Sequence, residues 1–191
     1  MDPLLGLAAV GGLITYAYMT SGPGNLVSVA SRVDGREYMV QNLPDKEEAA
    51  DRLAEIRRDI SKVLFEYKQP EYSQDQACQI LIKRFNPDNL MENDIESKHT
   101  SYSENKGEKI VLCLRHKDQQ GFPLVDKNTV MFVVLHECAH LMTFSNGHTQ
   151  EFWNNFRRLL QDSMKLGVYN EVNYSRTPAA YCGMMITDSP L

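Results

Sequence analysis

Two histidines four positions apart, with a glutamate beside the first, are the residues of this chain best suited to chemistry. His136, Glu137 and His140 form the pattern H-E-x-x-H, and a third histidine follows at His148. On a helix, residues four apart share a face, so His136 and His140 can bind one metal ion. Glu137, about 100° around the helix, can reach a water on that ion. The spacing predicts a hydrolytic zinc site with three histidine ligands and Glu137 as general base.

The motif lies in an uncharged stretch of sequence that fits a helix in the protein core. No Asp, Glu, Lys or Arg occurs in residues 130–135 or 141–146, on either side of it. Cys138 is the obvious rival ligand, but it lies about 200° around the helix from His136. We therefore predict that Cys138 is a buried core residue.

The ends of this helix determine where the third histidine can lie. Asp126 or Asn128 is placed to cap its start, and Gly147 readily takes a positive φ at its end. Thr149 is placed to cap a second helix, whose apolar residues recur at helical spacing. His148 therefore lies in a short corner between two helices, from which it can turn back to the metal.

Composition fits one globular domain. Hydrophobic residues make up 42% of the 191 residues, and the formal net charge is -5. Basic residues occur in short isolated pairs, so composition gives no support for strong nucleic-acid binding. The four cysteines form no C-x-x-C pair and lie in apolar stretches, which predicts reduced thiols. The sequence also leaves open one bridge, for example between Cys113 and Cys182.

An uncharged segment near the N-terminus is a candidate membrane anchor. Residues 4–19 carry no charge, and a turn sequence follows them. A helix of about 18 residues is ~27 Å long, close to the ~30 Å thickness of the hydrocarbon layer. We predict a transmembrane anchor over residues 1–21, with a docked apolar helix and a cleaved signal peptide as alternatives. Arg32 and Arg36 follow it, so the positive-inside tendency puts the rest of the chain on the cytoplasmic side.

The remaining sequence predicts a mixed α+β domain over residues 45–191. Residues 22–44 are rich in small and polar side chains and are predicted to be a linker with one docking strand. Periodicity in the domain predicts helices over 45–67 and 74–85, and a hairpin of strands over 100–103 and 109–115. The apolar tail after residue 165 is expected to pack back over the core.

Residues 130–164 resemble the WLM and SprT-like metallopeptidases, which place an H-E-x-x-H helix, a glycine-containing turn and a third histidine in this order. Aromatic residues shortly after the third histidine, here Phe152 and Trp153, extend the similarity. The strand over 109–115 and the sequence at 181–183 are similar to those of uncharacterised WLM-like proteins of large DNA viruses. The resemblance implies a zincin-like α+β fold with a small antiparallel sheet, and the uncharged run near the N-terminus predicts an apolar helix before it. It implies hydrolysis of protein substrates with these residues: zinc ligands His136, His140 and His148, and general base Glu137.

The best-known members of these families degrade proteins crosslinked to DNA. The sequence shows neither a basic DNA-binding tail nor a Cys-rich zinc module, so nucleic acid is a partner by resemblance alone. Combined with the candidate anchor, the motif predicts a single-pass membrane enzyme with its catalytic domain on the cytoplasmic side, with virion association as one setting.

Two other functions stay open. A catalytically silent, membrane-anchored structural or virion protein would close the fourth zinc position with a protein ligand, such as Cys182 or Glu171. A soluble crosslink-repair peptidase with a docked N-terminal helix would be stimulated by DNA. For an enzyme, Tyr169, Tyr174 and Tyr181 are candidates for a second group that stabilises the oxyanion.

Overall fold

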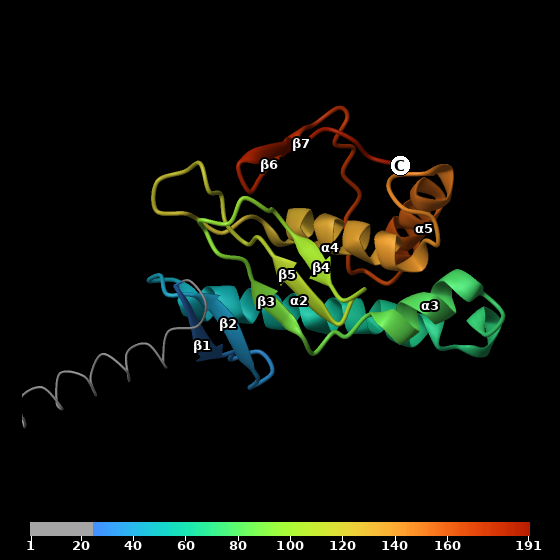
Figure 1. Cartoon of the computed structure of the whole chain (residues 1–191), viewed down its shortest axis with the longest axis horizontal. Coiled ribbons are helices and arrows are strands. Elements are labelled where there is room, and N and C mark those ends of the chain that lie inside the picture. The colour runs from blue at the N-terminus through green and yellow to red at the C-terminus, as the bar shows by residue number, and fades with distance from the viewer. Residues whose placement is uncertain (1–24) are drawn as a thin grey trace, which may run out of the picture.

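A long helix, α2 (Lys46–Tyr67), supports most of the other elements in the computed structural model, which describes residues 25–191. Its apolar residues recur every three or four positions and are buried along one face. The β1–β2 hairpin, α3, β3 and α4 all contact this helix. In Figure 1, α2 lies along one side of the molecule and the last hairpin, β6–β7, lies at the opposite side.

In chain order, the other elements are two strands before α2 and, after it, two helices, three strands, two helices and two strands. They are β1 (Leu26–Ala30), β2 (Glu37–Gln41), the 3-10 helix η1 (Pro70–Tyr72), α3 (Gln76–Arg84), β3 (Leu90–Glu92), β4 (Tyr102–Glu104), β5 (Lys109–Leu112), α4 (Lys127–Met142), α5 (Gln150–Lys165), β6 (Ala179–Tyr181) and β7 (Met184–Ile186). The predicted mixed α+β architecture is confirmed.

A three-stranded sheet has the order β3-β5-β4, and the turn between β4 and β5 lies against the end of α4. The predicted hairpin is confirmed as β4 and β5, which pair antiparallel with Tyr102 opposite Val111. β3 pairs parallel to β5 on the other side, with Leu90 opposite Ile110. β3 was not predicted because three residues are too few to show an alternating pattern. β4 is left at the edge of the sheet.

Of the predicted linker over residues 22–44, the described part, residues 25–44, contains two strands where one docking strand was predicted. Within them, β1 and β2 form an antiparallel hairpin that packs on α2. Leu26, Tyr38 and Val40 are buried in the core. In a strand, residues that face the core alternate with exposed ones. Over five residues this alternation is too short to stand out from the small and polar residues around it, so the sequence did not predict both strands. The folded part of the described chain therefore begins at β1, well before Asp45.

The predicted membrane anchor over residues 1–21 lies outside the described residues. Among residues 25–191, no helix has the length and apolar character needed to cross a membrane.

Two of the four cysteines form a disulfide, so the prediction of reduced thiols is wrong for this pair, and the bridge that the sequence left open, between Cys113 and Cys182, is the one observed. Cys113 directly follows β5, and Cys182 lies in the turn between β6 and β7. The two residues are 69 positions apart, and only the fold brings them together. Cys78 and Cys138 are free and buried, as predicted.

The tail after α5 packs back over the core, as predicted. Val168, Tyr169 and Tyr174 are buried in the hydrophobic cluster. The chain then forms the β6–β7 hairpin, which lies over α4 on the side away from α2 (Figure 1). This hairpin was not predicted, and it forms part of the cavity described below.

Candidate active site

Three histidine rings converge where α4 ends and α5 begins. Nε2 of His136 lies 3.1 Å from Nε2 of His140 and 3.3 Å from Nε2 of His148. Two nitrogens bound to one tetrahedral zinc ion at about 2.0–2.1 Å lie about 3.3–3.4 Å apart. The three predicted ligands are thus brought together, at a spacing that fits a shared metal ion.

The start of α4 is fixed by the side chain of Asp126. Its carboxylate accepts hydrogen bonds from the backbone N–H of Thr129, at 3.0 Å, and from the Thr129 hydroxyl. Asn128, the other candidate cap, instead bonds the backbone of Asn170 through both ends of its amide. Capping at Asp126 sets where the helix begins and so places His136 on the face that meets α5.

The turn that carries His148 is held by one carboxylate. Glu151 accepts hydrogen bonds from the backbone N–H groups of Phe144 and Ser145, at 3.0 and 3.2 Å, and from the Ser145 hydroxyl at 2.8 Å. The bond from Phe144 leads the contacts that lower the pKa of Glu151. Gly147 takes φ 79° in this turn, with open space around it. The positive φ turns the chain so that His148 faces α4.

Phe152 forms a floor beneath the histidines. Its side chain is fully buried, and its ring centroid lies 5.0 Å from that of His136, 4.4 Å from His140 and 4.6 Å from His148. Thr149 caps α5, as predicted, by accepting a hydrogen bond from the N–H of Phe152. Helical spacing predicts only that Phe152 faces the core. Its contact with all three rings becomes visible only once α4 and α5 are packed together.

The turn between β4 and β5 lies directly against the end of α4. A Cβ atom on Gly107 would lie 2.6 Å from Cδ1 of Leu141 and 2.8 Å from the carbonyl oxygen of Arg84. The Arg84 guanidinium also donates to the carbonyl oxygen of Leu141, at 2.8 Å. These contacts fix the sheet edge relative to the histidine pair.

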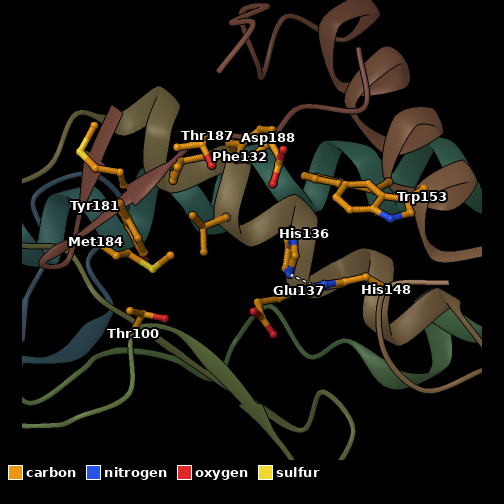
Figure 2. Close-up of a pocket in the computed structure, with 14 residues that line it drawn as sticks. Thr100, Phe132, His136, Glu137, His148, Trp153, Tyr181, Met184, Thr187 and Asp188 are labelled. Atoms are coloured by element: carbon orange, nitrogen blue, oxygen red, sulfur yellow. Dashed lines mark hydrogen bonds between the residues drawn. The ribbon is translucent and has the colours of Figure 1, made fainter. Parts of the chain in front are cut away.

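Glu137 lies beside the histidines with its carboxyl group in a buried setting. Burial raises the pKa of this carboxyl to about 7. Figure 2 shows its carboxyl group next to the His136–His148 pair. Burial, followed by the neighbouring histidines, lowers the pKa of His136 to about 3, which keeps the imidazole neutral. A neutral imidazole is the form that binds metal, and a carboxyl that titrates near pH 7 is suited to proton transfer.

The sequence that forms this site matches a known protein family. A model described as the WLM domain matches residues 80–179, just over half of the chain, and the match includes the three histidines and Glu137. The chain belongs to the WLM domain family. Residues 80–179 also contain the three-stranded sheet and both helices of the site.

The most similar relatives of this WLM domain protein include uncharacterised proteins of large DNA viruses. A protein of Acanthamoeba polyphaga mimivirus is 36% identical over 167 residues, which cover 85% of this chain and 83% of the relative. A protein of Invertebrate iridescent virus 6 is 35% identical over 92 residues, covering 48% of this chain and only 51% of the relative. The likeness to viral WLM-like proteins extends over most of the chain in the first case.

A solved structure shares the fold. Wss1 from Saccharomyces cerevisiae superposes with a TM-score of 0.51 at 23% identity, over 67% of this chain and 86% of Wss1. At this identity the likeness supports the WLM fold and nothing finer.

Two cavities open on the WLM histidine cluster from different sides. The first, here called the apolar pocket, has a volume of about 290 Å³ and contains His136, Glu137 and His148 among its lining residues. The second, here called the polar pocket, has a volume of about 300 Å³ and contains His140 together with Arg84 and Lys106. The histidine cluster thus has an apolar pocket on one side and a polar pocket on the other. This arrangement suits a peptide chain that passes across the cluster.

Of the three tyrosines considered for the oxyanion, Tyr181 is the one that lines a cavity of the WLM site. Its hydroxyl lies 2.5 Å from Oγ of Ser101, and the ring is buried. Tyr169 and Tyr174 instead pack against Phe132. Tyr181 is therefore a wall of the apolar pocket.

The residues considered as a fourth ligand are not in the cluster. Cys182 is bound to Cys113, and Glu171 is exposed. Within residues 25–191, the group that could hold a metal ion consists of the three histidines. Thr100 and Asp188 also line the apolar pocket. Nothing in their local sequence marked them, because they reach the site from distant loops.

Proposed function

We propose that this WLM domain protein is a zinc-dependent peptidase that hydrolyses protein substrates, with Glu137 as general base. The convergence of the three histidine Nε2 atoms beside the half-buried carboxyl of Glu137 carries the proposal. Three neutral imidazoles and a nearby carboxyl are the donor set of a hydrolytic zinc site.

The residues of the chain divide the reaction between them. His136, His140 and His148 would hold a zinc ion, which as a Lewis acid would polarise the scissile carbonyl and activate water near neutral pH. Glu137 takes a proton from the water as it adds to the carbonyl carbon, and passes it to the amine as the C–N bond breaks. The carboxyl group of Glu137 lines the same cavity as His136 and His148, so it can hold the proton between these two steps.

The edge strand β4 is placed to align the substrate. Thr100, just before it, lines the apolar pocket, and Ser103 within it lines the polar pocket. β4 pairs with β5 on one side, so its other edge can bond an extended peptide backbone. A peptide paired there would run from one pocket to the other, past the histidines.

The alternative function is a structural zinc site. The fourth coordination position of the metal distinguishes a structural site from a catalytic one. A structural ion is closed by a fourth protein ligand, whereas a catalytic ion leaves room for water. The disulfide withdraws Cys182 from that role. The cavity next to His136 and His148 offers the space that a substrate needs.

Zinc content and casein cleavage by parent and Glu137→Gln proteins test the proposal. The variant should keep one zinc per chain and lose at least about 10²-fold in cleavage rate, because the amide cannot take the proton. Glu71→Gln, which removes an exposed carboxyl on η1, is the matched control and should cleave at the parental rate. Parental cleavage by Glu137→Gln would refute its role. Zinc without cleavage in any of the proteins would favour the structural function.

We further propose that residues 1–21 anchor the enzyme in a membrane with the catalytic domain on the cytoplasmic side. The uncharged run over residues 4–19 and the two arginines that follow it support this placement. Alkaline extraction of membranes from expressing cells should leave the full chain in the pellet and release residues 25–191. Equal release of both would refute the anchor.

A further inference from the structure

We propose that the apolar pocket selects one bulky apolar side chain of the protein substrate, next to the bond that is cleaved. This inference rests on the proposed peptidase function and names the substrate feature that the same site recognises. The position, walls, volume and rigidity of the pocket support it.

The pocket opens directly on the groups proposed to react. His136, Glu137 and His148 line it, and Phe132 and Val133 continue the lining one turn earlier on α4. A side chain that fills this space belongs to a residue whose backbone lies at the histidine cluster. Its fit therefore determines which peptide bond is placed beside Glu137.

The walls of the pocket favour apolar contact. Trp153 of α5 and Met184 of β7 lie on opposite sides of it (Figure 2). Apart from the histidines and the phenol of Tyr181, the ionisable side chains that line it are Glu137 and Asp188, both acidic. A charged substrate side chain would lose hydration on entering the pocket, whereas an apolar one gains by leaving water. Asp188 is exposed, so water screens any attraction for a cation.

The volume suits one large side chain. The cavity measures about 290 Å³. An engineered protein cavity of about 150 Å³ holds a benzene molecule, whereas sites for whole drug-sized ligands run from about 300 to 1,000 Å³. An aromatic or long aliphatic side chain therefore fits with little strain, and a small side chain leaves most of the space empty.

The β7 wall is held in place before any substrate arrives. The disulfide between Cys113 and Cys182 joins the β6–β7 turn to the end of β5. The Tyr181 hydroxyl pairs with Oγ of Ser101, which also accepts a hydrogen bond from the N–H of Cys113 at 2.9 Å. A fixed wall discriminates between side chains better than a mobile one, because binding does not have to order it.

Met184 offers a substitution that changes the pocket without disturbing the core. Its side chain is 50% exposed, so a lysine there can reach water. Met184→Lys puts a cation on the apolar wall, and Met184→Leu keeps the wall apolar. Phe65→Lys on α2 is the matched control, because it makes the same kind of change at a residue that is 68% exposed and does not line the pocket.

The first test measures binding in the full-length, chelator-treated protein. Saturation-transfer NMR gives dissociation constants for capped amino acids, the N-acetyl N-methylamides of leucine, phenylalanine, glycine, lysine and aspartate. We expect leucine and phenylalanine to bind at least about tenfold more tightly than the other three. Met184→Lys should abolish this preference, and Met184→Leu and Phe65→Lys should retain it. Equal constants for all five, or a preference unaffected by Met184→Lys, would overturn the proposal.

The second test reads cleavage sites. Zinc-loaded full-length protein digests denatured casein, and mass spectrometry identifies the residues on both sides of each cut. We expect bulky apolar residues at one fixed position, at least about tenfold enriched over aspartate, with the enrichment lost in Met184→Lys. Cuts without this enrichment would overturn the pocket assignment and leave the peptidase intact. Selective binding without any casein cleavage would refute the peptidase and, with it, the assignment of the pocket to a substrate.

Discussion

Replacing Phe152 tests whether its ring holds the three histidines in their binding arrangement. The side chain is fully buried, and its centroid lies 4.4–5.0 Å from each histidine ring. Phe152→Ala removes six ring carbons and leaves a cavity that α5 and α4 can fill only in part. Substitutions of this kind lower the free energy of unfolding by about 3–5 kcal/mol.

The same change should weaken zinc binding more than global destabilisation explains. Without the floor, the imidazole rings gain rotamer freedom that metal binding must remove. Loss of groups that orient metal ligands typically lowers affinity by about 10–100-fold, and we expect roughly tenfold here. Competition with a fluorescent chelator measures zinc affinity, and urea denaturation of the metal-free protein measures stability.

A control with the same chemistry separates the two effects. Phe85 is 4% exposed, follows α3 and is not among the rings that contact the three histidines, so Phe85→Ala should cost a similar free energy of unfolding. Its zinc affinity should match that of the parent. If Phe85→Ala and Phe152→Ala weaken zinc binding equally, or if neither does, Phe152 is an ordinary core residue and the reasoning fails.

Three other changes have outcomes that the structure fixes. Burial raises the pKa of the Asp59 carboxyl, but hydrogen bonds from Lys127 and Lys62 outweigh this effect and bring the net pKa below its ordinary value. The ionised carboxylate therefore stabilises the fold above about pH 4, and this contribution is lost as the pH falls. In urea denaturation, Asp59→Asn should therefore cost about 1–3 kcal/mol at pH 7, with the difference from the parent shrinking below pH 4, and a constant difference would contradict this. Gly107→Ala, which meets Leu141 at positive φ, should cost about 2–4 kcal/mol and lower casein cleavage, whereas Gly35→Ala, with positive φ but open space, should cost about 1 kcal/mol and leave cleavage unchanged. Cys182→Ser should lower the free energy of unfolding by about 4 kcal/mol under oxidising conditions and make it insensitive to dithiothreitol, and a variant as stable as the parent would contradict the disulfide.

The arrangement of the candidate site could be predicted from sequence because its main signals are local. His136 and His140 share a helix face by spacing alone, and the caps at Asp126 and Thr149 are set by side chains within three residues of the groups they bind. Gly147 marks the turn in the same way. These features depend on a few neighbouring residues and hardly at all on the rest of the fold.

The parts that could not be predicted depend on contacts between distant segments. Arg115 reads as the polar end of a strand, yet it is 1% exposed and binds Glu92 at 2.7 Å and Asp45 at 2.8 Å. These partners lie 23 and 70 positions away in the sequence, so local periodicity cannot identify them. The β6–β7 hairpin could not be predicted for the same reason. Its three-residue strands are too short to show a pattern, and the disulfide that holds the hairpin joins residues far apart in the sequence.

The bond between Cys113 and Cys182 also makes a closed ring of the chain that carries the site. Every residue from the end of β5 to the β6–β7 turn, including α4, α5 and all three histidines, lies inside this ring. If the enzyme cuts itself once within the ring, the two pieces stay covalently joined and migrate as one protein on a non-reducing gel. Self-cleavage would then appear only after reduction, and an oxidised sample would look intact however extensively it had been cut at a single position.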